Sequence, residues 1–191
     1  MSSNAMKSTM EDLLQLPASR LKDGFSPLLE RIRHYGAEKI LEERPDFLAG
    51  LLGKLKEADA ARVFNGEVKA ADQLSDFLWE GVEFLASQSK EMKSLLAKVE
   101  RDFHVNIEAS DSPFRSHFVV EKGKIRGKSG LLHFKNEDFR FMGPTEVLID
   151  LLTGDLFLGF GNLRLQTAGH PGWVKRIAPI LRETSRLLKG G

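Results

Sequence analysis

Residues 103–121 read FHVNIEASDSPFRSHFVVE, and this stretch decides the fold class. Apolar and polar side chains alternate at 103–108 and again at 117–121. Between the two runs, Asp-Ser-Pro at 111–113 is a turn-forming sequence. Because a period of two places the apolar side chains on one face of a strand, the stretch predicts antiparallel strands in a sheet with one covered face.

The same alternation continues along the C-terminal half. Lys-Gly-Lys at 122–124 and Asn-Glu-Asp at 136–138 are further turn signals. We expect more strands at the apolar pairs Leu132 and Phe134, Phe139 and Phe141, and Leu163 and Leu165. The sequence therefore predicts a mainly antiparallel sheet.

Two helices are expected in the same half. The first starts near Pro144, a residue suited to a first helical position, and runs to Gly154, a common C-terminal stop. It is apolar on nearly every side, so it should be buried on more than one side. The second follows His-Pro-Gly at 170–172 and has one apolar stripe and basic outer faces. Pro179 within its pattern predicts a kink or a later start.

Up to about Arg101 the hydrophobic period is helical. Pro27 is expected to begin the first helix, whose apolar stripe reaches Ile40, and Pro45 separates it from the next. A longer helical stretch follows, with a break expected in the polar interval 86–91. Each helix has one apolar stripe, so each must pack on another element.

Composition limits the classes of function. The 191 residues are 41% hydrophobic and 29% charged, which is typical of a soluble domain, and we expect a cytoplasmic protein. A net charge of +1 gives no electrostatic reason to expect nucleic acid or an anionic membrane as a partner. The absence of cysteine excludes disulfides, thiolate nucleophiles and cysteine-ligated metals. No apolar run approaches the roughly 20 residues of a membrane helix, so we expect at most transient membrane contact, through the basic face of the last helix.

The change of period divides the chain. Residues 1–5 (Met-Ser-Ser-Asn-Ala) resemble an expression-tag remnant ahead of a native methionine, and no signal-peptide pattern follows. Residues 6–90 form the expected helical N-terminal region, and residues 91–191 form the expected α+β domain.

From about Met92 to Leu188, the order of elements resembles the sterol carrier protein (type two) family. The resemblance rests on a strand pair around the turn at Gly123, a strand Asp-Phe-Arg-Phe at 138–141, and a helix of the type Glu-Val-Leu-Ile-Asp-Leu-Leu-Thr-Gly at 146–154. A short apolar link, a Gly-x-Leu-x-Leu-x-x-x-Gly strand at 161–169 and a closing amphipathic helix follow. The helix, link and final strand are its most specific part.

The resemblance implies an α+β domain with a twisted, mainly antiparallel five-stranded sheet covered by helices. It also implies an apolar tunnel for a fatty acyl, sterol-like or isoprenoid lipid, with no cofactor. Some bacterial members are accessory factors in lipid or quinone metabolism. The long helical region in front departs from the plain carrier.

The candidate site is the apolar lining that such a tunnel would need. Thirteen Phe against one Tyr suit a dry interior, although a large filled core explains this bias equally well. The predicted lining is Phe118, Val120, Leu132, Phe134, Phe139, Phe141, Leu148, Leu152, Leu156, Phe157, Phe160, Leu163, Leu165, Trp173, Ile177 and Leu181. Trp173 is expected to anchor the last helix on the sheet or to form part of a movable lid.

Motifs for chemistry are missing from the sequence. The run Gly-Lys-Ser at 127–129 has Lys122 where a phosphate loop needs glycine. His117 and His133 are expected to point outward from adjacent strands, but no third metal ligand has suitable spacing. We therefore predict no catalytic residue and no metal, and we expect a non-enzymatic lipid-binding protein.

Two alternatives stay open. The first is a protein-interaction scaffold with a filled core, in which the N-terminal helices dock a partner or a second copy. The second is an enzyme that acts on a lipid in the cavity, and it would require a polar group deep inside. The volume beneath the last helix and a buried acid or histidine would separate these alternatives from lipid binding.

Overall fold

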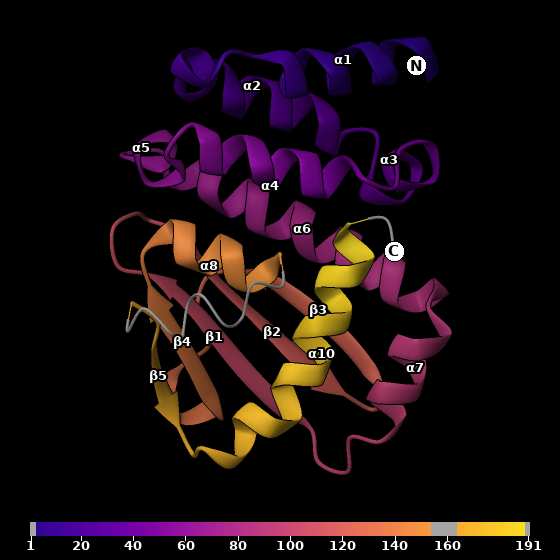
Figure 1. The fold of residues 1–191 in the computed structure, drawn as a ribbon, viewed down its shortest axis with the longest axis vertical. Helices are drawn as coiled ribbons and strands as arrows, with labels where there is room; N and C mark the ends of the chain where they lie inside the picture. Colours follow the sequence, from indigo (N-terminus) through magenta and orange to yellow (C-terminus); the bar gives the residue numbers. More distant parts are fainter. Residues whose placement is uncertain (1–2, 154–163, 190–191) are drawn as a thin grey trace.

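The computed structural model describes residues 3–153 and 164–189, and in them helices and one sheet form an α+β fold (Figure 1). The sheet has five strands in the order β3-β2-β1-β4-β5. The strands are β1 (Phe103–Ala109), β2 (Arg115–Glu121), β3 (Lys124–Ser129), β4 (Phe139–Gly143) and β5 (Gln166–Gly169). The predicted fold class is confirmed, and the sheet contains one parallel pair among its antiparallel ones.

That parallel pair is β1 with β4, in a register that sets Val105 beside Phe139. The other neighbours, β1–β2, β2–β3 and β4–β5, are antiparallel. The reason lies in the connection: β3 and β4 run in the same direction on opposite sides of β1 and β2. Residues 130–138 must therefore carry the chain back across the sheet, and the short turn of an antiparallel hairpin does not suffice.

Helices make up the first half of the chain (Figure 1). They are α1 (Ser3–Gln15), α2 (Leu21–Arg33), α3 (Ala37–Glu43), α4 (Phe47–Glu57), α5 (Ala60–Phe64), α6 (Val68–Gln88) and α7 (Lys90–Ala97). Two more follow the sheet strands, α8 (Thr145–Leu152) and α10 (Gly172–Leu188). None of these described helices is both long and apolar enough to cross a membrane.

Several helix boundaries differ from the predicted ones. The prediction that Pro27 begins a helix is wrong, because α2 begins at Leu21 and contains Pro27 in its interior. Ile40 lies in the separate helix α3, after Gly36 turns the chain with a φ of 81° that favours glycine. The predicted later start at Pro179 is also wrong, since α10 runs from Gly172 through that proline.

The break expected at residues 86–91 is confirmed. Helix α6 ends at Gln88 and α7 begins at Lys90. Ser89 between them accepts a hydrogen bond from the Met92 backbone N–H at 3.0 Å, so it is a true N-cap.

Helix α6 joins the helical region to the sheet along the edge strand β3. Trp79 lies against Gly127, where an added Cβ would be only 2.1 Å from the indole. The carboxylates of Asp76 and Glu83 accept hydrogen bonds from the backbone N–H groups of Ser129 and Gly127, at 2.8 and 3.1 Å. Since these are edge N–H groups, α6 closes a strand edge that would otherwise be open for pairing.

A buried hydroxyl fixes the same contact from the inner side. Ser116 of β2 is 1% exposed, and its Oγ accepts hydrogen bonds from Trp79 Nε1 at 2.6 Å and from Ser75 Oγ at 2.7 Å. It can in turn donate to the Lys128 carbonyl at 3.3 Å. These polar groups are therefore paired inside the core, as buried polar groups require.

The N-terminal helices and the sheet share one continuous hydrophobic core. The ring of Phe64 in α5 stacks on Phe114, which precedes β2, at a centroid distance of 6.2 Å. The ring of Trp79 in α6 lies 5.1 Å from that of Phe118 in β2. Helix α8 contacts α4 and α5 as well as β1 and β4, which confirms that it is buried on more than one side.

Candidate ligand-binding site

Most of the described lining residues that were predicted come from the inner face of the sheet and from α8 and α10, the helices that cover this face in Figure 1. Those that are buried in the core are Phe118, Val120, Phe139, Phe141, Leu148, Leu152, Leu165, Ile177 and Leu181, each 7% exposed or less. Their role as ligand contacts stays a prediction.

Strand register explains why these side chains meet. Val105 of β1 lies between Phe118 of β2 and Phe139 of β4, and all three face the helices. The rings of Phe139 and Phe141 follow each other on β4 at 5.0 Å, edge to face. Alternate residues on three neighbouring strands thus form one apolar surface beneath the helices.

Trp173, at the start of α10, lies half-buried at the border of this apolar surface. Its ring is 5.4 Å from that of Phe103 on β1, so it anchors α10 on the sheet as one of the two predicted roles requires. The guanidinium groups of Arg176 and Arg101 lie over the same indole, at 5.1 and 5.9 Å from its centroid. The indole is therefore a contact between the core and a cationic rim.

Two predicted lining residues lie elsewhere. The strand expected at Leu132 and Phe134 is wrong, because Leu132 is in a loop and Phe134 begins the short 3₁₀ helix η2 (Phe134–Asn136). Asn106, an outward residue of β1, binds the backbone of Leu132 on the opposite face of the sheet. Phe134 is 63% exposed. The physical reason is the return connection, which uses an apolar-polar alternation without pairing as a strand.

The strand predicted at 161–169 is shorter in the structure. Strand β5 begins at Gln166, and Leu165 lies just before it. The predicted lining residues Leu156, Phe157, Phe160 and Leu163 fall outside the described residues, as does the predicted helix stop at Gly154.

An interior cavity lies between α8 and the helices α4, α5 and α6. Its volume is about 10 Å³, near the size of a single water molecule, and its lining is apolar apart from Thr145. Leu148 and Leu152 line it, so these two residues face the N-terminal helices. A cavity of this size does not hold a lipid.

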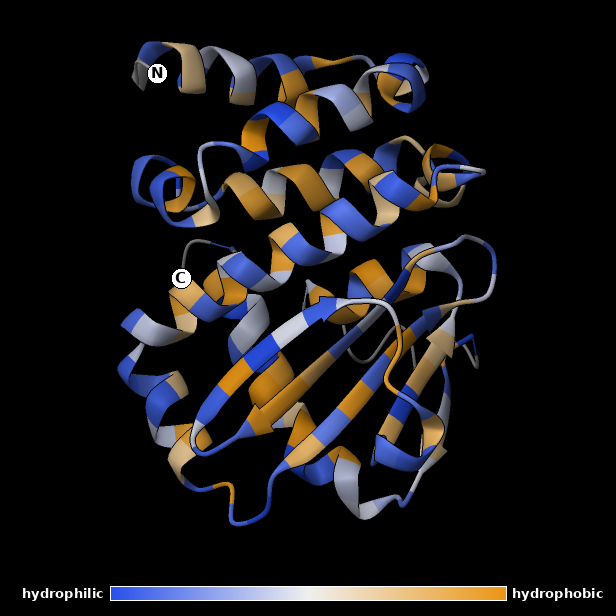
Figure 2. Cartoon of the chain, turned by 180° about the vertical axis from the view of Figure 1, so that it is seen from behind, coloured by the Kyte–Doolittle hydropathy of each residue, from blue (hydrophilic) through white to orange (hydrophobic). Residues whose placement is uncertain are grey.

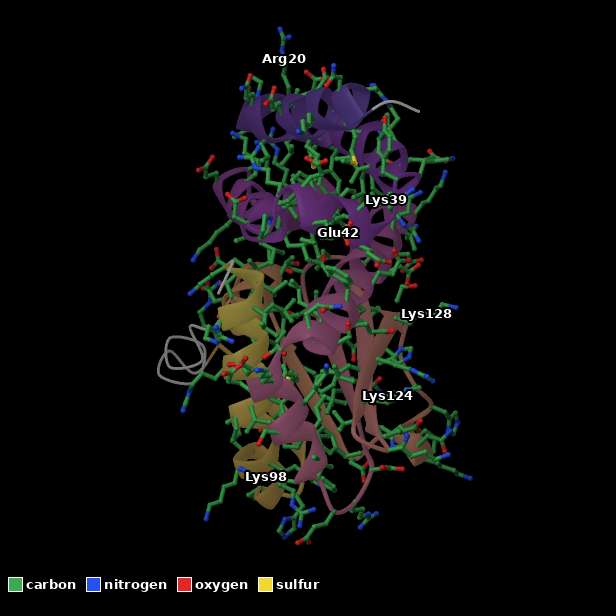
Figure 3. The ribbon with its side chains drawn as sticks, turned by 90° about the vertical axis from the view of Figure 1, so that its right-hand side faces the viewer. Arg20, Lys39, Glu42, Lys98, Lys124 and Lys128 are labelled. Atoms are coloured by element: carbon green, nitrogen blue, oxygen red, sulfur yellow. The ribbon has the colours of Figure 1, made fainter. Side chains whose placement is uncertain are left out.

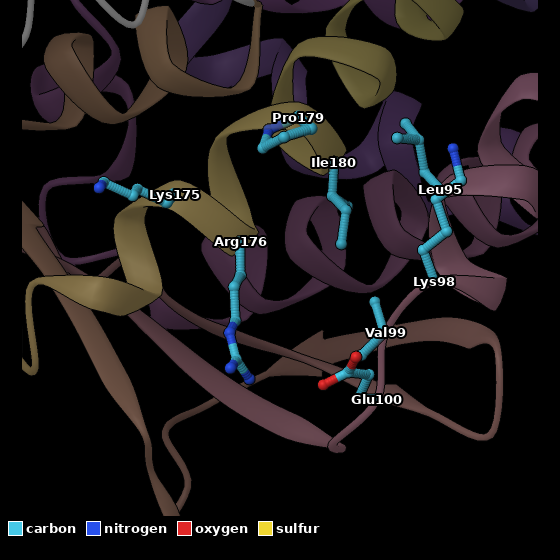
Figure 4. Close-up of a pocket in the computed structure, with 8 residues that line it drawn as sticks. All are labelled: Leu95, Lys98, Val99, Glu100, Lys175, Arg176, Pro179 and Ile180. Carbon is cyan, nitrogen blue, oxygen red and sulfur yellow. The ribbon is translucent and has the colours of Figure 1, made fainter.

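A much larger cleft opens at the surface between α7 and α10 (Figure 4). Its volume is about 380 Å³, within the range of small-molecule sites. Apolar atoms come from both helices and from the turn after α7. The apolar lining residues are Leu95, Val99, Pro179 and Ile180.

Charged groups surround this apolar floor. Lys98 and Glu100 come from the turn after α7, and Lys175 and Arg176 come from the first turns of α10. In Figure 4 the side chains of Arg176 and Glu100 extend to the same side of the cleft, whereas Lys175 points away. Since Arg176 also lies over Trp173, the cleft adjoins the border of the apolar inner face.

A hydrogen-bonded carboxylate joins the two helices farther along. Glu183 of α10 accepts hydrogen bonds from Ser89 Oγ at 3.1 Å and from the Arg186 guanidinium at 2.7 and 2.9 Å. The bonds from Arg186 hold the pKa of Glu183 below its ordinary value of 4.5. The N-cap of α7 is therefore tied to α10.

Few polar side-chain atoms in the described core lack a hydrogen-bond partner. Gln73 Oε1 and Thr184 Oγ1 are buried without a hydrogen-bond partner in the described part of the chain. His117 Nδ1 donates a hydrogen bond to the Gly130 carbonyl at 3.0 Å, and His133 lies in the loop before η2 rather than on a strand. Within residues 3–153 and 164–189, no group of three His, Asp or Glu side chains is placed to hold a metal ion.

Sequence reasoning did not find the cleft. Leu95 and Val99 were visible as part of the α7 stripe, and Ile180 as part of the α10 stripe, but nothing in the sequence indicates that the two stripes meet at an open edge. The cationic rim was visible only as helix surface. That these cations surround a cleft depends on how α7 and α10 pack together, and hydrophobic periodicity does not show this packing.

Comparison with known proteins gives likenesses to solved structures alone. No family model matches the chain, and no curated protein matches it. Among solved structures, the apo form of sterol carrier protein 2 from Yarrowia lipolytica is similar at 14% sequence identity and a TM-score of 0.41. The likeness covers 61% of this chain and 93% of that chain.

Proposed function

We propose that the protein binds a hydrophobic small molecule non-covalently, a fatty acyl, sterol-like or isoprenoid lipid, with the α7–α10 cleft as its binding site or as the mouth of that site. The observation that carries the proposal is an apolar floor of both helices in a cleft of about 380 Å³, beside the apolar inner face of the sheet. The driving force is burial of ligand surface, at about 25 cal/mol per Å².

The rim of the cleft favours a ligand with an acidic or polar end. Lys98, Lys175 and Arg176 carry positive charge, and Glu100 is the acid beside them. A carboxylate or phosphate at the mouth would gain charge-assisted hydrogen bonds from Arg176 while the apolar part of the ligand covers Leu95 and Val99. A shift of the first turns of α10 would widen the cleft toward Phe103, which Trp173 contacts.

Titration with the fluorescent fatty acid cis-parinaric acid tests the proposal. Val99→Glu places a charge on the floor of the cleft and is expected to weaken binding by roughly tenfold or more. The matched control is Val68→Glu, because Val68 is 56% exposed at the start of α6, and this variant should bind as the wild type does. Urea unfolding of both variants separates lost binding from lost folding.

A filled interior is the observation that favours the second candidate, a protein-interaction scaffold. The inner-face side chains are buried against the helices, and the cavity beside α8 measures only about 10 Å³. If wild-type protein takes up neither cis-parinaric acid nor a sterol nor a quinone, the scaffold is the better account. If Val99→Glu and Val68→Glu bind equally, the cleft is not the site.

A further inference from the structure

The edge strand β3 carries a row of cations on its outer side. Lys124, Arg126 and Lys128 are alternate residues, so they share one face, and all three are exposed. Figure 3 shows Lys124 and Lys128 on the side of the sheet away from α10. No described carboxylate forms an ion pair with any of the three, although Glu83 of α6 lies close enough to Arg126 to sense its charge.

An exposed aromatic ring belongs to the same face. Phe134 is 63% exposed, with the ring of His133 at 4.4 Å and Lys135 Nζ at 6.0 Å from its ring centroid. It is one of the large hydrophobic side chains that the described part of the chain leaves exposed, and a cationic residue follows it directly.

The segment that presents Phe134 is firmly held. Asn106 is fully buried, and its side chain accepts a hydrogen bond from Leu132 N at 2.8 Å and donates one to Leu132 O at 3.0 Å. On the other side of η2, Glu137 accepts hydrogen bonds from Arg140 at 2.9 and 3.0 Å. The exposure of Phe134 is therefore built into the fold.

Acidic groups elsewhere on this face have cationic or histidine partners. Glu108 pairs with Arg140 at 2.9 Å and with Arg115 at 3.2 Å. Glu121 and Asp138 flank His104, each at 3.2 Å from one of its ring nitrogens. Lys135 and the three cations of β3 form no ion pair with a described carboxylate, so they are cations of this face that stay available to a partner.

A second cleft opens beside the β3 row, between the β2–β3 hairpin and the helices α6 and α7. Its volume is about 400 Å³, and its lining includes the buried apolar residues Ala86, Leu96 and Ile125. Lys124 and Arg126 line it too. Cations next to an apolar floor suit the headgroup and acyl boundary of a lipid layer.

We propose that this outer surface, formed by Lys124, Arg126, Lys128, Phe134 and Lys135, docks on an anionic lipid bilayer. The cations lie against lipid phosphates, and Phe134 inserts at the interface. Neighbouring strands are about 4.8 Å apart, so Leu132, which Asn106 holds over β1, lies roughly 10 Å from β3 across the sheet. η2 follows Leu132 on the same face, so one lipid surface can meet both β3 and η2. The proposal does not depend on the ligand site, which lies on the other side of the sheet.

A nucleic acid fits the surface less well. Single-strand binding needs several aromatic platforms along a cationic groove, whereas here one phenylalanine and a histidine stacked on it are offered. The outward side chains of β1 and β4, His104, Asn106, Glu108 and Arg140, are occupied by pairing within the protein.

Co-sedimentation of the full chain with phosphatidylcholine vesicles containing 30% phosphatidylglycerol tests the docking. Lys124→Gln/Arg126→Gln/Lys128→Gln should weaken partitioning about 100-fold, at about fivefold per charge, and Phe134→Ser about tenfold. The matched control is Arg20→Gln/Lys22→Gln/Lys39→Gln, three exposed cations that lie outside the sheet on the N-terminal helices, and Figure 3 labels Arg20 and Lys39. It removes the same net charge and should bind within about threefold of wild type.

Distinct results would overturn the docking. They are wild-type protein that stays in the supernatant at low salt, equal loss in the β3 and control triple variants, or full binding by Phe134→Ser. Tighter binding to a fluorescent single-stranded oligonucleotide than to the vesicles would mean that this surface binds nucleic acid instead of lipid. Unchanged vesicle binding by Val99→Glu, together with lost uptake of cis-parinaric acid, would show that the two sites are independent.

Discussion

The two faces of the sheet are built on opposite principles. On the inner face, alternate residues of β1, β2 and β4 are buried beneath helices, and apart from Ser116 they are not polar. On the outer face, which Figure 2 shows with no described α-helix over it, the same strands carry ion pairs around Glu108 and Arg140 and a buried amide at Asn106. Neighbouring residues of one strand are therefore stabilised differently. Burial of apolar surface stabilises those on the inner face, and hydrogen bonds and ion pairs stabilise those on the outer face.

This difference places the proposed functions. An apolar face covered by helices can accept a hydrophobic ligand only where the cover is incomplete, and the α7–α10 cleft is such a place. An open face can meet a large planar partner, and the β3 row with Phe134 provides the charge and the anchor. The net charge of +1 concealed this second surface, because the positive charge is concentrated on one side.

The largest expected effect on stability comes from comparing alanine substitutions at two adjacent residues of β4. Phe141 is 1% exposed on the inner face, and Phe141→Ala should lower the free energy of unfolding by roughly 3–5 kcal/mol. Met142, the next residue, is half-buried on the outer face, and Met142→Ala should cost under about 1 kcal/mol. Urea denaturation measures both. Similar losses would mean that the two faces do not differ in how they are held.

A smaller effect on stability is expected from Asn106→Ala, which tests how the outer face holds the loop before η2. Asn106→Ala removes the bonds to Leu132 and should cost about 1–3 kcal/mol, because it leaves a buried N–H unpaired. It should also speed amide exchange at residues 131–136. The control is Val119→Ala, on the same face without such bonds, which should leave that exchange unchanged. Equal exchange in both variants would show that Asn106 does not hold the loop.

The smallest effect is a pair of opposite pH dependences. The pKa of Glu183 is lowered by Arg186, so its stabilisation is present above pH 4.5 and is lost as the pH falls through the lowered pKa. The pKa of Glu83 is raised above 4.5, chiefly by burial, so stability is present below pH 4.5 and is lost as the pH rises through the raised pKa.

Substitution by glutamine tests these two signs. Glu183→Gln should be less stable than wild type at pH 6, by at most about 1 kcal/mol, and close to it at pH 3. The stability of Glu83→Gln relative to wild type should increase as the pH rises from 4 to 7. Urea unfolding across this range gives both slopes, and slopes of the same sign would refute the assignment of causes.

Sequence periodicity predicted the inner face well where a strand has one mainly apolar side, as β1, β2 and β4 do. The strands that contain Val105, Phe118 and Phe141 were predicted at the right places, and so was the break before α7. Local signals failed where tertiary structure decides. Leu132 and Phe134 alternate like a strand but follow a return connection, and Pro27 is tolerated within α2.

The two candidate sites were less predictable for the same reason. The cleft joins Val99 to Ile180, residues that lie far apart in the sequence. The outer surface combines β3 with η2, whose loop is held on β1 by the buried residue Asn106. A sequence pattern does not show which distant residues meet in the fold. It does show the apolar residues of the predicted lining, but such residues are equally suited to a packed core and to a ligand site.

Native mass spectrometry of the purified protein, with organic extraction of whatever co-purifies, tests the central claim most directly. Lipid binding predicts a bound mass of lipid size that is lost on denaturation and is absent or strongly reduced in Val99→Glu but retained in Val68→Glu. A ligand-free mass for wild-type protein that persists after incubation with fatty acids, sterols and quinones would contradict the claim and leave the scaffold as the account of this fold.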